Sequence, residues 1–215
     1  MSIIIAKSTF KRLPSYLNYL NHKKSQGFVM ISSTLIAEEL QVHPVKVRKD
    51  LASTGTVGMP KNGFNTDELI HNIRIMLGYQ NCNEAILVGA GRLGKALLSY
   101  EDFEQCGVRI VAAFDLDPSV CQTEVGGKPV MHTDRLPELV QRLKPSIGVI
   151  TVPAAEAQEV CQMLVEAGVL AIWNFAPIHL KAPASILVHN ENLAASLALL
   201  ASSLQRSLSE TGRTE

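Results

Sequence analysis

The sequence lacks both paired cysteines and a long hydrophobic run near its first residue. The run at Ile3 to Ile5 is three residues long, which is too short for the core of a signal peptide or for a membrane span. No C-x-x-C pair occurs among the four cysteines, which are Cys82, Cys106, Cys121 and Cys161. We therefore expect a cytoplasmic protein with free thiols, no metal site and no contact with a membrane.

A glycine motif follows a continuous hydrophobic run. The run at Ala85 to Val88 leads into G-x-G-x-x-G, and a helical pattern of hydrophobic residues begins at once. In such a motif Gly89 permits a sharp turn, Gly91 lets a pyrophosphate approach the backbone, and Gly94 lets the helix pack closely on its strand. The motif predicts that a dinucleotide binds along Gly89, Ala90, Gly91, Arg92, Leu93 and Gly94.

An acidic residue completes the dinucleotide fingerprint. The β-rich run RIVAAFD ends at Asp115, about twenty residues after the third glycine, where an acceptor for a ribose hydroxyl is expected. No arginine stands beside Asp115 to bind a 2′-phosphate, which favours NADH and NAD⁺ over their phosphorylated forms. The alternative is a glycine-rich turn that binds nothing, and the presence of both halves argues against it.

Strand and helix patterns alternate after Asp115, which predicts a doubly wound parallel sheet of the Rossmann type. Strands are expected near Val130 and at residues 147–152, 170–175 and 186–189, with helices at 135–143 and 154–167. Ligands of such sheets lie outside the carboxyl ends of the strands. The nicotinamide side should therefore be lined by Thr151, Val152, Pro153, Ala154, Asn174, Phe175, Ala176 and Pro177.

The net charge of zero hides an uneven distribution of charge. Up to Asn65 the sequence has nine basic and three acidic residues, so this part carries a charge of +6 and the remainder carries −6. A small basic segment joined to an acidic nucleotide-binding one is typical of a nucleic-acid reader with a sensor. The alternative is that these basic residues form a solvent-exposed face that binds no nucleic acid.

Two short helices in the basic segment have the form of a helix-turn-helix. Ser32 or Ser33 caps a helix that runs to Leu40, and His43 caps a second helix that opens at Pro44. On the second helix Val47 and Leu51 would face inward, which leaves three cations for DNA: Lys46, Arg48 and Lys49. A plain helical hairpin would give the same periodicity. The turn-rich stretch from Gly55 to Asn65, whose only charge is Lys61, would be a β-hairpin wing.

Further helices are expected on both sides of this module. Hydrophobic residues from Phe10 to Leu20 follow a helical pattern, with Ser8 or Thr9 as its cap, and Thr66 caps a helix that extends to Gly78. The polar residues 80–83 would be a linker. We expect a winged-helix DNA-binding domain at residues 1–79, a Rossmann domain at 84–190, and a C-terminal helix and tail at 191–215.

The C-terminal segment from Asn192 to Ser209 is an amphipathic helix by its pattern. One stripe holds Leu193, Leu197, Leu200, Leu204 and Leu208. Such a stripe would pack either on the chain's own sheet or on a second copy as a dimer arm.

A catalytic interpretation is less well supported than a sensor. The spacing Tyr-x-x-x-Lys occurs at Tyr19 and Lys23, ahead of the Rossmann unit, while His132, His179 and His189 lie near predicted strands or their exits. No separate substrate domain accompanies them. The chain is therefore expected to be a sensor rather than an enzyme, with an NAD-dependent oxidoreductase as the alternative. A protein–protein sensor that does not bind DNA is a third possibility.

Six stretches follow one another along the chain: RLPSYLNYL at residues 12–20, VRKDL at 47–51, VGAGRLGKALLSY at 88–100, AAFDLDP at 112–118, TVPAAEAQEV at 151–160 and NFAP at 174–177. Together they resemble the family of redox-sensing transcriptional repressors, Rex. The resemblance implies a winged helix, a Rossmann domain that binds NADH and NAD⁺ differently, and a homodimer with exchanged C-terminal helices. Such repressors bind palindromic operators and leave them when NADH accumulates.

The sequence departs from the family pattern in the wing and before the last helix. The wing usually has an aromatic pair after RKDL and a Lys-Arg pair further on, and here Ser53-Thr54 and Met59-Pro60 stand there. The resemblance places Ser53 and Lys61 at the DNA. It also implies coupling through Arg12, Tyr100 and an acid that would exchange between them, but Asn192 occupies the position of that acid.

Overall fold

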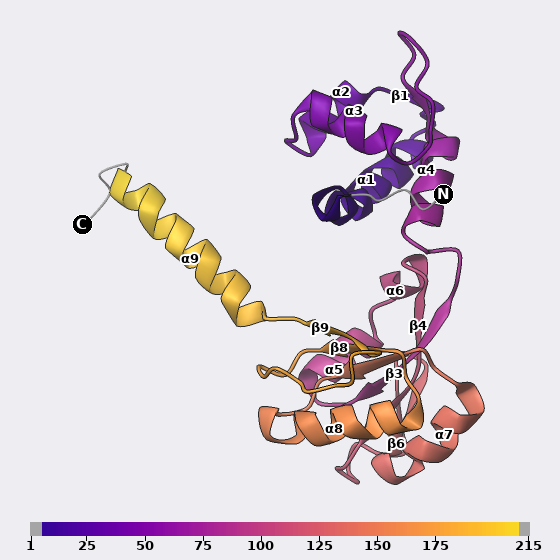
Figure 1. Ribbon diagram of the computed structural model, residues 1–215, viewed down its shortest axis with the longest axis vertical. Helices are drawn as coiled ribbons and strands as arrows, with labels where there is room; N and C mark the ends of the chain where they lie inside the picture. Colours follow the sequence, from indigo (N-terminus) through magenta and orange to yellow (C-terminus); the bar gives the residue numbers. More distant parts are fainter. Residues whose placement is uncertain (1–5, 211–215) are drawn as a thin grey trace. The chain divides into compact units, whose positions relative to one another are not determined.

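Figure 1 shows the computed structural model of the chain, which describes residues 6–210. The chain divides into two units. The first contains the residues up to Cys82 together with Gln105–Gly107, and the second contains Asn83–Glu104 and the residues from Val108 onward. The sequence does not predict the return of Gln105–Gly107 to the first unit, because three residues carry no periodicity.

The first unit is a winged helix. Its elements are α1 (Lys7–Ser25), β1 (Met30–Ile31), α2 (Ser33–Glu39), α3 (Pro44–Ala52), β2 (Phe64–Asn65) and α4 (Thr66–Met76). β1 pairs antiparallel with β2, and an isolated bridge joins Met59 to Gly63 in the wing. The predicted helix-turn-helix and wing are confirmed.

Capping explains where these helices begin. As predicted, Ser32 caps α2 by accepting the Leu35 N–H at 3.1 Å, and the Nδ1 of His43 accepts the Val45 N–H at 3.3 Å. Two predicted caps are wrong. No side chain caps α1, which follows Ala6, so Ser8 and Thr9 lie inside it, and Asn65 rather than Thr66 caps α4.

Hydrophobic side chains from all four helices form the core of the first unit. α1 contributes Leu13, Tyr16 and Leu20, each with no exposed surface, and they pack with residues such as Val47 of α3 and Leu69 of α4. The predicted buried face of α1 is confirmed from Leu13 to Leu20, but the prediction is wrong for Phe10, which is 45% exposed. Pro14 is accommodated within the helix.

The second unit is a doubly wound sheet, as predicted. Its strands are β3 (Asn83–Val88), β4 (Val108–Asp115), β5 (Thr123–Val125), β6 (Lys128–His132), β7 (Ile147–Ile150), β8 (Ala171–Asn174) and β9 (Leu187–Asn190). They lie in the order β5-β6-β4-β3-β7-β8-β9, and only the β5-β6 pair is antiparallel. The chain leaves β3 toward β4 on one side and has β7 on the other, which makes the carboxyl end of β3 the topological switch point.

Helices cover both faces of this sheet (Figure 1). They are α5 (Arg92–Leu98), α6 (Asp102–Gln105), the 3₁₀ turn η1 (Thr133–Arg135), α7 (Leu136–Leu143) and α8 (Ala154–Ala167). Leu98 of α5 belongs to the core on one face, whereas Val140 of α7 and Leu164 of α8 belong to the core on the other. The short elements β5 and α6 are absent from the sequence prediction.

The last helix, α9 (Leu193–Glu210), has no hydrophobic cover in the single chain. Every side chain from Leu193 to Ser209 is exposed, and Leu197 and Leu200 of the predicted stripe are 67% and 66% exposed. Packing on the chain's own sheet, one of the two alternatives left open by the sequence, is therefore not observed. Among residues 6–210, no helix is long and hydrophobic enough to cross a membrane.

Gly94→Ala is expected to lower the free energy of unfolding of the second unit by about 1–3 kcal/mol. A Cβ at this position would collide with the carbonyl oxygen of Gly89 and lie 3.1 Å from Cδ2 of Leu87. Urea denaturation followed by the fluorescence of Trp173, the single tryptophan of the chain, measures the change. Gly91→Ala is the control, since a Cβ on Gly91 meets nothing within 4 Å. Equal loss in both variants would contradict this account.

Candidate functional site

The glycine loop connects β3 to α5 and leaves its outer side open. Gly89 has φ +101°, which favours glycine, and a Cβ there would lie 2.9 Å from the backbone of Thr151. Gly91 is the residue before α5, where no side chain provides a cap. Because the space beside Gly91 is empty to 4 Å, a phosphate group has room to reach the backbone at the start of α5.

Asp115 and Thr151 hold this loop from the two neighbouring strands. The Oδ2 of Asp115 accepts the Ala90 N–H at 2.7 Å, and its Oδ1 accepts the Asp117 N–H at 2.9 Å. Directly after β7, the Oγ1 of Thr151 donates to the carbonyl oxygen of Gly89 at 2.7 Å. Two of about four acceptor positions on the Asp115 carboxylate are thus used, which leaves capacity for ribose hydroxyls.

A pocket of about 240 Å³ opens beside Asp115. It lies between the end of β4, η1 and the first turns of α8, and it is lined by Val88, Gly89, Asp115, Leu116, Thr133, Asp134, Val152, Glu156, Glu159, Val160 and Met163. Sequence reasoning missed most of these residues. The signal was present on α8, where Glu156, Glu159, Val160 and Met163 are spaced as one helical face.

Asn174 lies in the interior of the second unit, at the end of β8. Its side chain has no exposed surface. Its Nδ2 donates to the carbonyl oxygens of Ala176 and Ile178 and to Oδ1 of Asn190, while its Oδ1 accepts the Ala176 N–H. These bonds shape the loop that carries Phe175, and the cofactor contact expected of Asn174 stays a prediction.

The DNA-facing prediction for α3 agrees with the burial of its side chains. Lys46, Arg48 and Lys49 are exposed, whereas Val47 and Leu51 have no exposed surface. The three cations form one side of the helix and are available to a partner.

The wing stands beside α3 across a shallow depression of about 460 Å³. Arg48 from α3 and Lys61 from the wing line it, together with Met59 and Pro60. Ser53 follows α3 and donates its hydroxyl to the carbonyl oxygen of Asp50 at 2.6 Å. The structure thus brings Arg48 and Lys61 to one surface. Ser53 does not line this depression, and its hydroxyl instead binds the last turn of α3.

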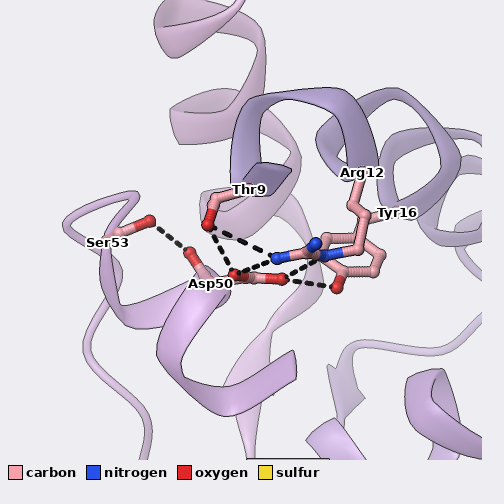
Figure 2. Close-up of polar contacts among 5 residues, drawn as sticks. All are labelled: Thr9, Arg12, Tyr16, Asp50 and Ser53. Atoms are coloured by element: carbon pink, nitrogen blue, oxygen red, sulfur yellow. Dashed lines mark hydrogen bonds and ion pairs between the residues drawn. The ribbon is translucent and has the colours of Figure 1, made fainter. Parts of the chain in front are cut away.

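A buried carboxylate on α3 binds α1 (Figure 2). Asp50 is 4% exposed. Arg12 donates to it from Nε at 2.7 Å and from Nη2 at 2.8 Å, Tyr16 donates from its hydroxyl at 2.7 Å, and Thr9 donates from its hydroxyl at 2.8 Å. This network fixes the helix that carries the exposed cations to the first helix of the unit.

The network changes the acidity of its members. Burial by itself would raise the pKa of Asp50, but the hydrogen bonds from Arg12, Tyr16 and Thr9 outweigh burial and lower this pKa below its ordinary value. Burial and the hydrogen bond to Asp50 raise the pKa of Tyr16 to about 12. The hydrogen bonds to Asp50 also raise the pKa of Arg12. Asp50 is therefore ionised at neutral pH.

Sequence reasoning missed the role of Asp50, although a signal was present. Asp50 is three residues after Val47 and one before Leu51, so an acid occupies the inward face of α3. The residues expected to couple the two units have defined local roles: Arg12 binds Asp50, and the Oδ1 of Asn192 caps α9 by accepting the Ala195 N–H at 2.8 Å.

Comparison with known proteins gives a consistent result for both units. Residues 4–52 match the family described as "Putative DNA-binding protein N-terminus", and residues 81–178 match the family described as "CoA binding domain". The redox-sensing transcriptional repressor Rex of Treponema denticola is 41% identical over 195 residues, which cover 91% of this chain and 93% of that protein. The protein of the same name from Streptomyces coelicolor is 38% identical over 206 residues, or 96% of this chain and 80% of that protein.

Solved structures of a repressor called RSP are similar over nearly the whole chain. RSP in complex with β-NAD⁺ and operator DNA has a TM-score of 0.87 and is 32% identical, covering 98% of this chain and 97% of that chain. RSP in complex with β-NADH has a TM-score of 0.83 and is 30% identical, covering 98% and 99%.

Asp50→Asn is expected to lower the stability of the first unit by on the order of 3 kcal/mol at pH 7, because Arg12 would lose its buried counter-charge. Since the folded-state pKa of Asp50 is lowered, its contribution is complete above the unfolded pKa of about 4 and is lost as pH falls through the folded value. The loss should therefore shrink in acid. Thermal unfolding followed by circular dichroism measures it. Asp67→Asn, which removes an exposed pair with Lys24, should cost less than about 1 kcal/mol, and a similar cost for both variants would refute the assignment.

Proposed function

The chain belongs to the Rex family of redox-sensing transcriptional repressors, and we propose that it represses transcription as a homodimer that binds palindromic operator DNA and releases it when NADH binds. It acts by binding and catalyses no reaction. The observation that carries this proposal is the presence, in one chain, of a helix with a fixed cationic side and a glycine loop held by Asp115. We place the protein in the cytoplasm, where it would have access to both DNA and NADH.

On the DNA side, α3 is the recognition helix that enters the major groove. Lys46 and Arg48 are the candidates for base edges, and Lys49 is the candidate for a phosphate. Lys61 in the wing reaches the backbone or the minor groove, and Ser53 lies at the end of α3. The Asp50 network supports this arrangement because it fixes α3 on α1.

On the nucleotide side, the glycine loop holds the pyrophosphate. Its backbone from Gly89 to Gly94 includes Ala90, Arg92 and Leu93, and the open space at Gly91 supports this placement. Asp115 accepts hydroxyls of the adenosine ribose, and the pocket beside it takes the adenine. Thr151, Val152, Pro153 and Phe175 follow β7 and β8 on the nicotinamide side, Asn174 shapes this edge, and Tyr100 completes the site.

The response depends on differential binding. A ligand shifts an equilibrium between two states only by binding one of them better. NADH and NAD⁺ differ by a hydride, and therefore in the charge and planarity of the nicotinamide. Phe175 packs against the ring of Trp173. A nicotinamide of different charge and planarity would pack differently against this aromatic pair. Coupling between the units runs through Arg12, Tyr100 and Asn192.

The second subunit covers the leucine stripe of α9. Its residues from Leu193 to Leu208 are exposed in the single chain, and a stripe of this length is more hydrophobic than a solvated helix needs to be. A homodimer also gives a palindromic operator its matching two-fold symmetry.

Purified protein should bind a family operator, and NADH should release it. Gly91→Val is expected to abolish NADH binding in a titration, because its side chain would occupy the space of the pyrophosphate, and to leave operator binding unchanged in the absence of nucleotide. Consumption of NADH by the parent protein would instead identify an oxidoreductase. NADH binding without any DNA binding would identify a sensor of a protein partner.

Substitutions on α3 should separate phosphate contacts from base contacts. Lys49→Gln is expected to weaken binding to all sequences and to reduce the salt dependence by about one unit of slope. Lys46→Gln or Arg48→Gln should cost about 1–3 kcal/mol and relax the preference at one operator position. Fluorescence anisotropy with a set of single-base operator variants measures both effects, with the exposed Lys181→Gln of the second unit as the control. Losses without sequence dependence at all three positions would leave only a generic basic surface.

A further inference from the structure

Four aromatic rings form a row in the second unit. The ring centroids of Tyr100 and Phe103 are 4.8 Å apart, those of Phe103 and Trp173 are 5.6 Å apart, and those of Trp173 and Phe175 are 4.6 Å apart. Tyr100 follows α5, Phe103 lies in α6, and Trp173 lies in β8 with Phe175 just beyond it. The row therefore connects the residue expected at the nicotinamide, Phe175, with the residue expected in coupling, Tyr100.

Trp173 also reaches the segment that enters α9. Its Nε1 donates a hydrogen bond to Oε1 of Glu191 at 3.3 Å, and the Nε2 of His189 lies 3.0 Å from the same oxygen. The Glu191 N–H donates to the carbonyl oxygen of Asn174 at 2.8 Å. Glu191 is therefore held to β8 by its side chain and by its backbone, directly before Asn192 caps α9.

Trp173 is thus in contact with three places that have separate roles in the proposed switch. They are the nicotinamide side at Phe175, the end of the α5 segment at Tyr100 through Phe103, and the start of α9 through Glu191. Trp173 and Phe103 belong to the packed core on the α5 face of the sheet as partly buried members. Phe175 packs against the same core, whereas Tyr100 is 52% exposed at the end of the row. A shift of Phe175 therefore acts on Trp173, against which it is packed.

We propose that Trp173 and Glu191 are positioning residues of the redox response, and that their hydrogen bond carries a shift of Phe175 to the first residues of α9. A change in the nicotinamide moves Phe175, and the indole of Trp173 follows it. The indole then strengthens or loses its hydrogen bond to Glu191. Because Glu191 directly precedes the cap of α9, the direction of this dimer helix changes with it. The inference rests on the proposed function. It adds a route by which the nicotinamide side can act on α9 within one subunit.

This path compensates for the absent acid at Asn192. A neutral amide makes weaker hydrogen bonds than a carboxylate. The neighbouring carboxylate of Glu191 has a charged oxygen already in contact with Trp173 and His189. The carboxylate of the segment is therefore displaced by one residue, and it contacts β8 of its own subunit through Trp173.

The test measures the ratio of operator affinities without and with saturating NADH, using the full-length dimer. Trp173→Phe keeps an aromatic ring and removes the N–H donor, and Glu191→Ala removes the acceptor. Each is expected to reduce the ratio by about three- to tenfold, while the affinity for NADH without DNA stays within about twofold of the parent. The double variant should resemble either single variant, because both act on one hydrogen bond.

Conservative and distant variants separate positioning from folding. Glu191→Gln retains an acceptor oxygen and should restore most of the ratio. Glu138→Ala removes an exposed carboxylate of α7 that pairs only loosely with Arg135, and it should leave the ratio unchanged. Thermal unfolding of each variant shows whether the fold is retained.

Three results would overturn the inference. If both Trp173→Phe and Glu191→Ala keep the affinity ratio of the parent protein, the hydrogen bond does not contribute to the redox response. Loss of NADH affinity in Glu191→Ala would make it a binding residue instead. A ratio of one in the parent protein would overturn the proposed function itself, and this outcome is distinguishable because it involves no substitution.

Discussion

The buried carboxylate of Asp50 is the constraint on which the DNA-facing side of this protein depends. A charge removed from water must be compensated by hydrogen bonds and an opposite charge. Here α1 supplies all three donors, from Thr9, Arg12 and Tyr16. These contacts fix both the rotation of α3 about its own axis and its distance from α1, since only one orientation brings Asp50 to Arg12. With Asp50 inward, Lys46, Arg48 and Lys49 face outward. The hydrogen bonds to Asp50 therefore determine which side of α3 presents its cations to solvent.

The proposed nucleotide site depends on side chains that hold the backbone of the glycine loop. Asp115 ends β4 and Thr151 directly follows β7, which are the two strands that flank β3. Both side chains hold the glycine loop in place without a bound ligand. A loop fixed before the ligand arrives loses little conformational entropy on binding. Asn174 has a similar role at the end of β8, where its side chain makes three hydrogen bonds to the backbone of Ala176 and Ile178 around Phe175 and a fourth to Asn190.

Much of the fold could be predicted from the sequence, and the errors have physical causes. α8 was predicted at its observed bounds, because alanine-rich helical periodicity is followed by Gly168, whose φ of +99° ends the helix. β5 and α6 have three and four residues, too few for any period to be visible. The cap of α1 was misplaced because Thr9, which has the chemistry of a cap, uses its hydroxyl for Asp50 instead. The site residues in motifs were predictable, but the contacts of Trp173 join residues far apart in sequence and required the fold.

Because α9 exposes its leucine stripe, the fraction of chains that pair would depend on the concentration of the protein in the cell. In the proposed homodimer, a chain that leaves these side chains in water gains stability by pairing with a second copy, so its assembly follows mass action. While dimers are scarce, their number grows with the square of the number of chains. Halving synthesis would then reduce the active species about fourfold. A gene under such control would respond sharply to its regulator's abundance, independently of any nucleotide.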